Sequence, residues 1–222
     1  GEYNYNFMQP ENGENPVDTF FANFNWGKSE VDYSISTAKW INRNPYDVLA
    51  GLELQKGGSY KTNVDWNAIL DEHGKLRLSL GLYAPDTITG LGKTGEGYHT
   101  HEDLFWTGFQ GDPTKGKPAD QSWYGMSNLV VDKTPITNAD FNTSFNTGHG
   151  KYWFVDGKIS KDGEWNYRSV SGYLPTWRWW VEHSEDSTPL KGRYDFDQAY
   201  NGGNSLTFEG DLKANSSQNV ML

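Results

Sequence analysis

Three short apolar runs, each followed by polar or aromatic residues, constrain the fold of this chain most strongly. They are TFFANFNW at 19–26, DVLAGLEL at 47–54 and LRLSLGLYAP at 76–85. The second run is apolar almost throughout, as a parallel strand covered on both faces must be. In (β/α) barrels the active-site residues lie at the carboxyl ends of such strands. The pattern therefore predicts consecutive parallel strands with candidate functional side chains at their ends.

Helical segments are predicted between these strands. Residues 29–41 carry apolar residues at nearly the helical period, and Asn44-Pro45 ends this segment because a residue before proline disfavours the α region. Residues 64–70 predict a second, shorter helix. The order strand, helix, strand, helix, strand indicates an α/β fold with crossover helices. Three strands cannot close a barrel alone, because a barrel needs eight strands and typically about 250 residues.

The second half of the chain has a different character. Short alternating or aromatic runs are divided by Gly, Asn and Asp, which predicts β-rich structure with turns at 156–157, 162–163 and 202–203. Residues 86–133, between the two regions, are predicted to form long loops with a helical piece near 102–109.

Charge and composition restrict the classes of partner. The formal net charge is −10, which argues against nucleic acid and anionic membrane surfaces, since both favour a basic face. Aromatic residues make up 15% of the chain and there is no cysteine, so a neutral ligand recognised by stacking and hydrogen bonds fits better than thiolate chemistry. No run approaches the ~20 apolar residues of a membrane span. We interpret both ends as cut points in a longer polypeptide.

Five stretches carry a resemblance to a known family. Together FFANFNW, RNPYDVLAGLELQKGGSYKT, GKLRLSLGLYAPDT, FNTSFNTGHGKYWFVDGK and DFDQAYNGGNSL resemble glycoside hydrolase family 85, the endo-β-N-acetylglucosaminidases, and bacterial surface members of the endo-D type in particular. The resemblance covers essentially the whole chain. It implies cleavage of the β-1,4 bond between the two GlcNAc residues in the core of N-linked glycans. It also implies an extracellular or cell-surface location, glycoproteins as partners and no cofactor or metal.

The resemblance implies a (β/α)₈ TIM barrel followed by β-sandwich domains. On this basis residues 1–133 would be the C-terminal half of the catalytic barrel, and 134–190 an aromatic β-rich connecting segment. Residues 191–222 would begin a truncated, jelly-roll-like β-sandwich. The N-terminal half of the same barrel is then missing from this chain.

The mechanism implied by the resemblance is substrate-assisted, which departs from the usual pair of enzyme carboxylates. The 2-acetamido oxygen of the sugar attacks the anomeric carbon, one Glu acts as acid and then base, and an Asn two residues before it orients the acetamide. The string at 12–14, Asn-Gly-Glu, lies between Pro10 and Pro16 without an apolar strand to deliver it. We therefore expect the catalytic pair upstream, no catalytic residue in this chain, and no activity of the chain alone.

Three candidate substrate-binding residues follow the first strand. Trp26 would stack on a sugar face, or else pack its loop onto the barrel. Asn23 and Asn25 fall at alternate positions and so share a side, with Phe24 on the other. Each Asn would hydrogen-bond sugar hydroxyls or satisfy a turn.

Two further candidates end the next strands. Glu53 ends an otherwise apolar run, where a carboxylate is costly to bury unless it is paired or used. Family 85 carries an acidic residue there, and the alternative is a salt bridge to a lysine or arginine. Tyr83 would donate a hydrogen bond to the reacting sugar or simply pack.

Other motifs favour structural interpretations. The spacing of His99, His101 and Glu102 matches no strong zinc signature, and the segment is interpreted as a solvated loop. His149 lies in a glycine turn and is interpreted as structural. The TWRWW run at 176–180 is expected to bridge the barrel to the next domain, and a glycan-binding patch is the alternative. A non-catalytic carbohydrate-binding module and a scaffold domain are the alternatives to the enzyme.

Overall fold

The computed structural model describes residues 2–92, 95–108, 123–130, 133–174 and 179–221. The chain divides into two compact units. Unit 1 comprises Gly1–Gly90 and Glu102–Val130, and unit 2 comprises Leu91–His101 and Val131–Leu222. The predicted TWRWW bridge falls mostly at 175–178, outside the described residues.

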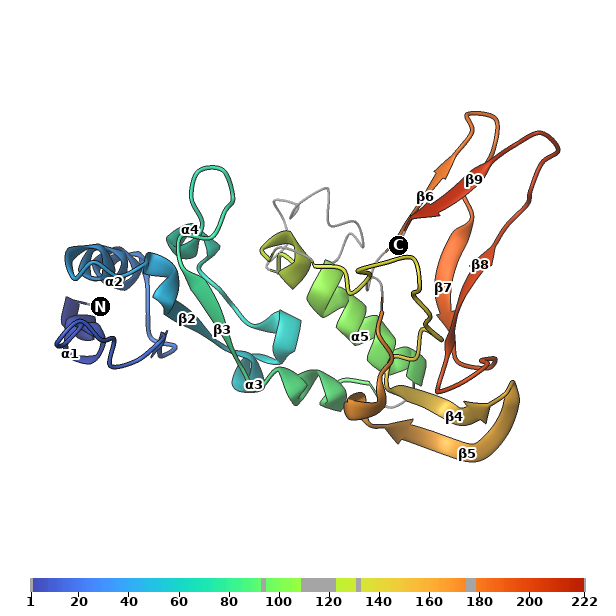
Figure 1. The fold of residues 1–222 in the computed structure, drawn as a ribbon, viewed down its shortest axis with the longest axis horizontal. Helices are drawn as coiled ribbons and strands as arrows, with labels where there is room; N and C mark the ends of the chain where they lie inside the picture. The colour runs from blue at the N-terminus through green and yellow to red at the C-terminus, as the bar shows by residue number, and fades with distance from the viewer. Residues whose placement is uncertain (1, 93–94, 109–122, 131–132, 175–178, 222) are drawn as a thin grey trace. The chain divides into compact units, whose positions relative to one another are not determined.

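Unit 1 contains the predicted parallel sheet. The strands β1 (Phe20–Ala22), β2 (Val48–Glu53) and β3 (Ser79–Tyr83) pair in the order β1-β2-β3, and both pairings are parallel (Figure 1). β1 ends at Ala22, inside the 19–26 run, because the Asn23 side-chain oxygen accepts a hydrogen bond from the Phe24 N–H at 2.9 Å. β3 begins three residues later than expected, because Leu76 pairs with Leu70 in an isolated bridge. The α/β character of this region is confirmed.

Helices connect these strands at the predicted places. The α-helices of the described residues are α1 (Tyr5–Met8), α2 (Lys28–Trp40), α3 (Leu54–Gly57), α4 (Trp66–Ile69) and α5 (Gly95–Thr107). Short 3₁₀ turns occur at Glu2–Asn4, Pro45–Asp47, Ser59–Lys61, Pro85–Gly90, Met126–Asn128 and Arg168–Val170. The helices α2 and α4 confirm the predictions for 29–41 and 64–70 to within a few residues.

The two faces of the sheet are covered differently. On one face the buried side chains of Val48, Ala50 and Leu52 meet α2, whose Val31 and Ala38 are also buried. On the other face the ring of Phe21 lies against Gly51 and Gly81, so closely that a Cβ at Gly81 would come within 2.3 Å of the ring. Phe21 remains 43% exposed, so this second face is only partly covered.

A buried arginine fastens the N-terminal segment of unit 1. The Arg43 side chain donates hydrogen bonds to the carbonyl oxygens of Met8, Val17 and Asp18 at 3.2, 3.1 and 2.7 Å. Its Nε also donates to Asp47 Oδ2 at 2.8 Å, and the Arg43 side chain is only 4% exposed. A buried charge with all these partners holds the segment before β1 against the turn before β2.

Unit 2 is built from antiparallel pairs. β4 (His149–Val155) pairs with β5 (Lys158–Asn166), β6 (Trp180–His183) with β9 (Gln218–Met221), and β7 (Lys191–Asp195) with β8 (Ser205–Glu209). The turn predicted at 156–157 is confirmed, since it joins β4 to β5. The turn predicted at 162–163 is wrong. Gly163 lies inside β5 near a register shift, where its φ of +115° fits an irregular strand.

A hydrogen-bond network around Asn146 and Asn204, which we call the asparagine network, holds unit 2 together. Asn204, which is fully buried, accepts hydrogen bonds from the N–H and hydroxyl of Thr147 and donates to the Phe145 carbonyl. Asn146 Oδ1 accepts from the Gly203 N–H at 3.1 Å. A Cβ at Gly203 would lie 2.1 Å from the His149 carbonyl oxygen, so only glycine allows this approach.

The helix α5 confirms in part the helical piece predicted near 102–109, and it corrects the loop interpretation of the residues just before that piece. His99, His101 and Glu102 lie on this helix and not in a solvated loop. Aromatic packing explains the difference, because the His99 ring centroid lies 4.4 Å from that of Tyr194 within unit 2. In unit 1, Phe105 is 2% exposed and its carbonyl accepts the Trp123 indole N–H at 2.9 Å.

Candidate functional site

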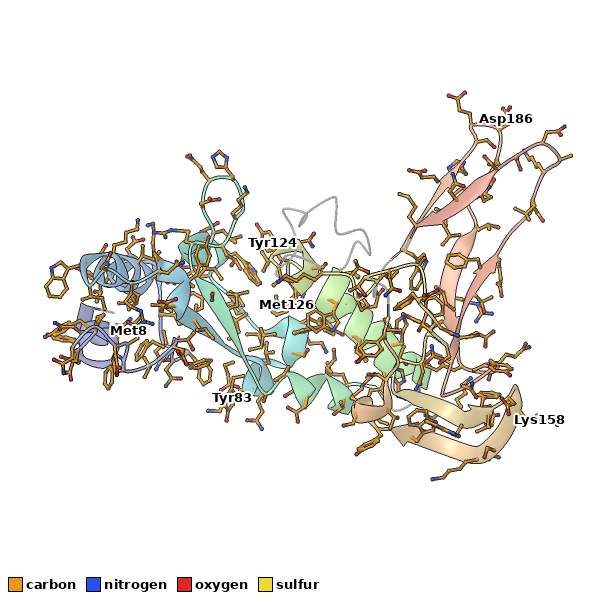
Figure 2. The ribbon with its side chains drawn as sticks, viewed as in Figure 1. Met8, Tyr83, Tyr124, Met126, Lys158 and Asp186 are labelled. Atoms are coloured by element: carbon orange, nitrogen blue, oxygen red, sulfur yellow. The ribbon has the colours of Figure 1, made fainter. Side chains whose placement is uncertain are left out.

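The carboxyl ends of β2 and β3 bring two predicted site residues together. Glu53 and Tyr83 are register partners, so they occupy the same level of the sheet on adjacent strands. In a parallel sheet side chains at one level of neighbouring strands point to the same face. Figure 2 labels Tyr83 where β3 ends.

Glu53 is held by backbone hydrogen bonds. Its Oε1 accepts the N–H groups of Gln55 at 3.1 Å and Lys56 at 3.3 Å, and so caps the N-terminus of α3. The Glu53 carbonyl accepts the Thr62 hydroxyl at 3.0 Å. Among the described residues, the carboxylate therefore bonds to backbone donors instead of the lysine or arginine left as the alternative. A cap of this kind fixes the position of a carboxylate while its second oxygen can accept further donors.

Tyr83 belongs to an aromatic cluster on the partly covered face of the sheet. Its ring centroid lies 5.2 Å from that of Phe24, which lies 6.0 Å from that of Phe21. We call Phe21, Phe24 and Tyr83 the strand-end aromatic cluster. Tyr83 is 46% exposed, so its ring and hydroxyl are accessible. Sequence reasoning placed Phe24 opposite the two asparagines but did not recognise it as a candidate.

The other three predicted residues line a different space. Asn23, Asn25 and Trp26 border a cavity of about 250 Å³ beside the N-terminal part of α2. The Trp26 indole N–H donates to the Gly51 carbonyl at 2.9 Å, which ties the loop after β1 to β2. Both asparagines are exposed and line this cavity, although they follow the end of β1, so strand alternation does not account for their shared side.

Glu30 adds a carboxylate to this cavity that sequence reasoning missed. The Gly27 N–H donates to Glu30 Oε2 at 2.9 Å, and this bond, with a lesser one from the Ser29 hydroxyl, keeps the pKa of Glu30 below its usual value. The spacing of Glu three residues after the residue that precedes a helix was the available signal. The cavity thus combines amide, indole and carboxylate groups.

Asp103 on α5 is a second missed carboxylate, outside the strand-end positions. Burial raises the pKa of its carboxyl, and a 3.2 Å hydrogen bond from the Thr107 hydroxyl opposes this shift. A carboxyl group with a raised pKa is a candidate general acid, but raised pKa values also occur at purely structural positions.

The string at 12–14 forms a tight surface turn. Glu11 and Glu14 exchange two backbone hydrogen bonds of 2.9 Å, and Asn12 and Gly13 both have positive φ. Positive φ at both central positions defines a type I′ turn, for which Asn-Gly is preferred. This geometry supports the structural interpretation of the string.

The described residues contain no group of three or more His, Cys, Asp or Glu side chains arranged to hold a metal ion. The helices within these residues also lack the length and apolar character needed to cross a bilayer.

The geometry supports binding better than bond cleavage by these residues alone. An exposed tyrosine, a capped carboxylate and an aromatic cluster meet at adjacent strand ends. Such a surface can stack on the apolar face of a sugar ring and hydrogen-bond its hydroxyls.

Comparison with known proteins places the chain among glycoside hydrolases. The model of glycosyl hydrolase family 85 matches residues 1–153. The glycoside hydrolase domain of Spr0440, Endo-D from Streptococcus pneumoniae R6, is 68% identical with a TM-score of 0.88. That match covers 99% of this chain and 34% of the solved chain.

Two curated proteins are also similar. The cytosolic endo-beta-N-acetylglucosaminidase of Danio rerio is 26% identical over 198 residues, which are 87% of this chain and 24% of that protein. The cytosolic endo-beta-N-acetylglucosaminidase 1 of Arabidopsis thaliana is 24% identical over 204 residues, 90% of this chain and 26% of that protein. The chain thus spans about a quarter of either relative. Because both are cytosolic, the expectation of an extracellular or cell-surface location is wrong.

Proposed function

This chain belongs to glycosyl hydrolase family 85, and we propose that it forms part of an endo-β-N-acetylglucosaminidase acting on the core of N-linked glycans. The observation that carries the proposal is the 68% identity, over 99% of the chain, to the glycoside hydrolase domain of Endo-D. The bond cleaved would be the β-1,4 linkage between the two core GlcNAc residues, by the substrate-assisted route.

Within that enzyme, unit 1 would supply one wall of the active site. The parallel strands β1, β2 and β3 would be consecutive strands of a (β/α)₈ barrel, and their carboxyl ends would face the substrate. The second face of the sheet, where Phe21 is half exposed, would be the barrel interior. The pair β7–β8, within 191–222, would begin the β-sandwich that follows, and the pair β4–β5 would belong to the connecting segment at 134–190.

Each strand-end residue has a specific proposed role. Tyr83 would donate its hydroxyl to the sugar in the site, with Phe24 providing the apolar support beside it. Glu53, fixed by the two N–H groups of α3, would accept a sugar hydroxyl through its other oxygen. Trp26, Asn23 and Asn25 would shape the rim around the neighbouring cavity. The acid/base Glu and the orienting Asn would come from a strand outside this chain, so the chain alone would be inactive.

Release of glycan from a glycopeptide with a high-mannose core tests this proposal. A polypeptide joining this chain to the N-terminal half of the barrel, with its Asn-x-Glu strand, should cleave the substrate, whereas the 222-residue chain should not. Glu53→Gln, which keeps a capping oxygen, should lower kcat/KM roughly tenfold, or about 1.4 kcal/mol. Glycan binding by the longer polypeptide without cleavage would contradict the proposal and favour a carbohydrate-binding module.

A further inference from the structure

Unit 2 contains a shallow hollow that the proposed active site does not use. It has a volume of about 730 Å³ and lies between the β4–β5 turn and the segment that precedes β8. The buried Phe154 borders it, and Ile159 and Tyr200 line it with 54% and 65% of their surfaces exposed. Figure 2 labels another lining residue, Lys158, at the turn of this hairpin. The hollow is within the size range of small-ligand sites.

Backbone hydrogen bonds hold Tyr200 at the edge of this hollow. The Tyr200 carbonyl accepts the Gly157 N–H at 2.8 Å, and the Asn201 side-chain oxygen accepts the Asp156 N–H at 3.1 Å. A Cβ at Gly157 would lie 4.0 Å from the Tyr200 ring, so the ring stands next to the bare glycine of the turn. The aromatic side chain is therefore presented to solvent by a fixed backbone.

The polar residues of the hollow are also positioned by local contacts. Asp195 Oδ1 accepts the N–H groups of Asp197 at 2.8 Å and Gln198 at 3.2 Å, which fixes the turn after β7. The Ser205 hydroxyl donates to the Gln198 carbonyl at 2.8 Å. Sites on a pre-formed backbone lose less conformational entropy on binding.

The charges around the hollow are balanced. Asp197, which lines the hollow, pairs with Lys151 at 3.0 Å, and Lys158 is a basic residue of the same lining. This balance disfavours polyanions such as nucleic acid, which need an excess of basic side chains. An exposed aromatic ring surrounded by amide, ammonium and carboxylate groups complements a neutral molecule that has both apolar faces and hydroxyls.

We propose that this hollow binds a neutral oligosaccharide. The Tyr200 ring stacks on the C–H face of one sugar unit, because both surfaces are apolar. Lys158 Nζ and the Gln198 amide hydrogen-bond the hydroxyl groups at its edge, and Ile159 contacts the adjoining unit. All of these residues lie in unit 2, so the proposed sugar binding does not depend on the proposed hydrolytic activity.

Heteronuclear NMR titration with N,N′-diacetylchitobiose and with mannotriose tests this site. With at least one of them, the amide signals of Gly157, Lys158 and Gln198 should shift and saturate with a millimolar Kd. Tyr200→Ala should weaken this binding about tenfold. Tyr200→Phe should retain it, because stacking does not require the hydroxyl group. Tyr173→Ala is the matched control, since Tyr173 is 77% exposed in unit 2 and does not line the hollow.

Three results would overturn the proposal. The first is the absence of shifts at these amides with both sugars. The second is unchanged binding in Tyr200→Ala when its amide spectrum otherwise matches that of the parent chain. The third is saturation by a sulfated polysaccharide but by neither neutral sugar, which would assign the hollow to an anionic ligand.

Discussion

The two units of this chain hold their candidate site residues by different means. In unit 1, strand register places Glu53 beside Tyr83, and helix packing covers the opposite face of the sheet. In unit 2, side chain-to-backbone contacts of Asn146 and Asn204 and the close approach of Gly203 hold short antiparallel pairs together. Functional positions in unit 1 therefore follow the periodicity of regular structure, whereas those in unit 2 depend on individual turns.

Loss of the buried arginine should have the largest effect, and it should be confined to unit 1. Arg43→Met removes four hydrogen bonds and leaves Asp47 without its partner. We expect a loss of about 4 kcal/mol in the free energy of unfolding of unit 1. Hydrogen exchange, read separately for the amides of each unit, measures this loss. The exposed Lys39→Met is the control, and equal losses in both units would contradict a role of Arg43 confined to unit 1.

In unit 2, the change that corresponds to Arg43→Met is the loss of the asparagine network. Asn204→Ala leaves the Thr147 N–H and hydroxyl and the Phe145 carbonyl without their partner in a buried place. The expected cost is about 3 kcal/mol, confined to unit 2 in the same exchange measurement. Asn219→Ala, at an exposed position on β9, should change stability by less than about 0.5 kcal/mol. A small effect of Asn204→Ala would show that hairpin packing alone holds unit 2.

The close contact of Phe21 with the sheet should give a smaller effect. Gly81→Ala places a methyl group 2.3 Å from the Phe21 ring, which is half exposed and can move aside. We expect a cost of about 2 kcal/mol in chemical denaturation. Gly90→Ala serves as control because nothing lies within 4 Å of its new Cβ. Equal stability of the two variants would mean that the aromatic cluster does not rest on the sheet.

The pH dependence of stability should differ between two carboxylates of unit 1. Burial raises the pKa of Asp103, so the folded state favours its protonated form and stability is lost as the pH rises through that pKa. Hydrogen bonds from Lys28 and then Arg77 lower the pKa of Asp32, so its contribution is lost as the pH falls. Asp103→Asn should therefore raise the melting temperature at neutral pH but not in acid. Asp32→Asn should lower the melting temperature at neutral pH. A lower melting temperature of Asp103→Asn at neutral pH, or a higher one of Asp32→Asn, would contradict these assignments.

The sequence predicted unit 1 better than unit 2, for physical reasons. Apolar runs with a helical segment between them are sufficient to place β2 and β3, because strand and helix periods are local properties. The strand β1 is shorter than the predicted 19–26 run, because the Phe24 N–H donates a hydrogen bond to the Asn23 side-chain oxygen where the strand ends. Gly163 was taken for a turn, since glycine in a turn and glycine in a bulge have the same sequence signal.

The candidate site was predictable only in part. Residues at strand ends were identifiable, and Glu53 and Tyr83 do lie together. The separate cavity around Trp26, and the carboxylates of Glu30 and Asp103, depend on how helices pack. Such tertiary contacts leave no periodic signal in a single sequence.

The central claim is that the strand ends of unit 1 form a wall of a family 85 active site. The most direct measurement is kcat/KM for release of an N-glycan by the longer polypeptide that includes the N-terminal half of the barrel with its Asn-x-Glu strand. Tyr83→Ala should reduce it roughly tenfold, whereas Tyr33→Ala, at a position on α2 that is 54% exposed against 46% for Tyr83, should leave it unchanged. Full activity in Tyr83→Ala, or equal losses in both variants, would contradict the claim.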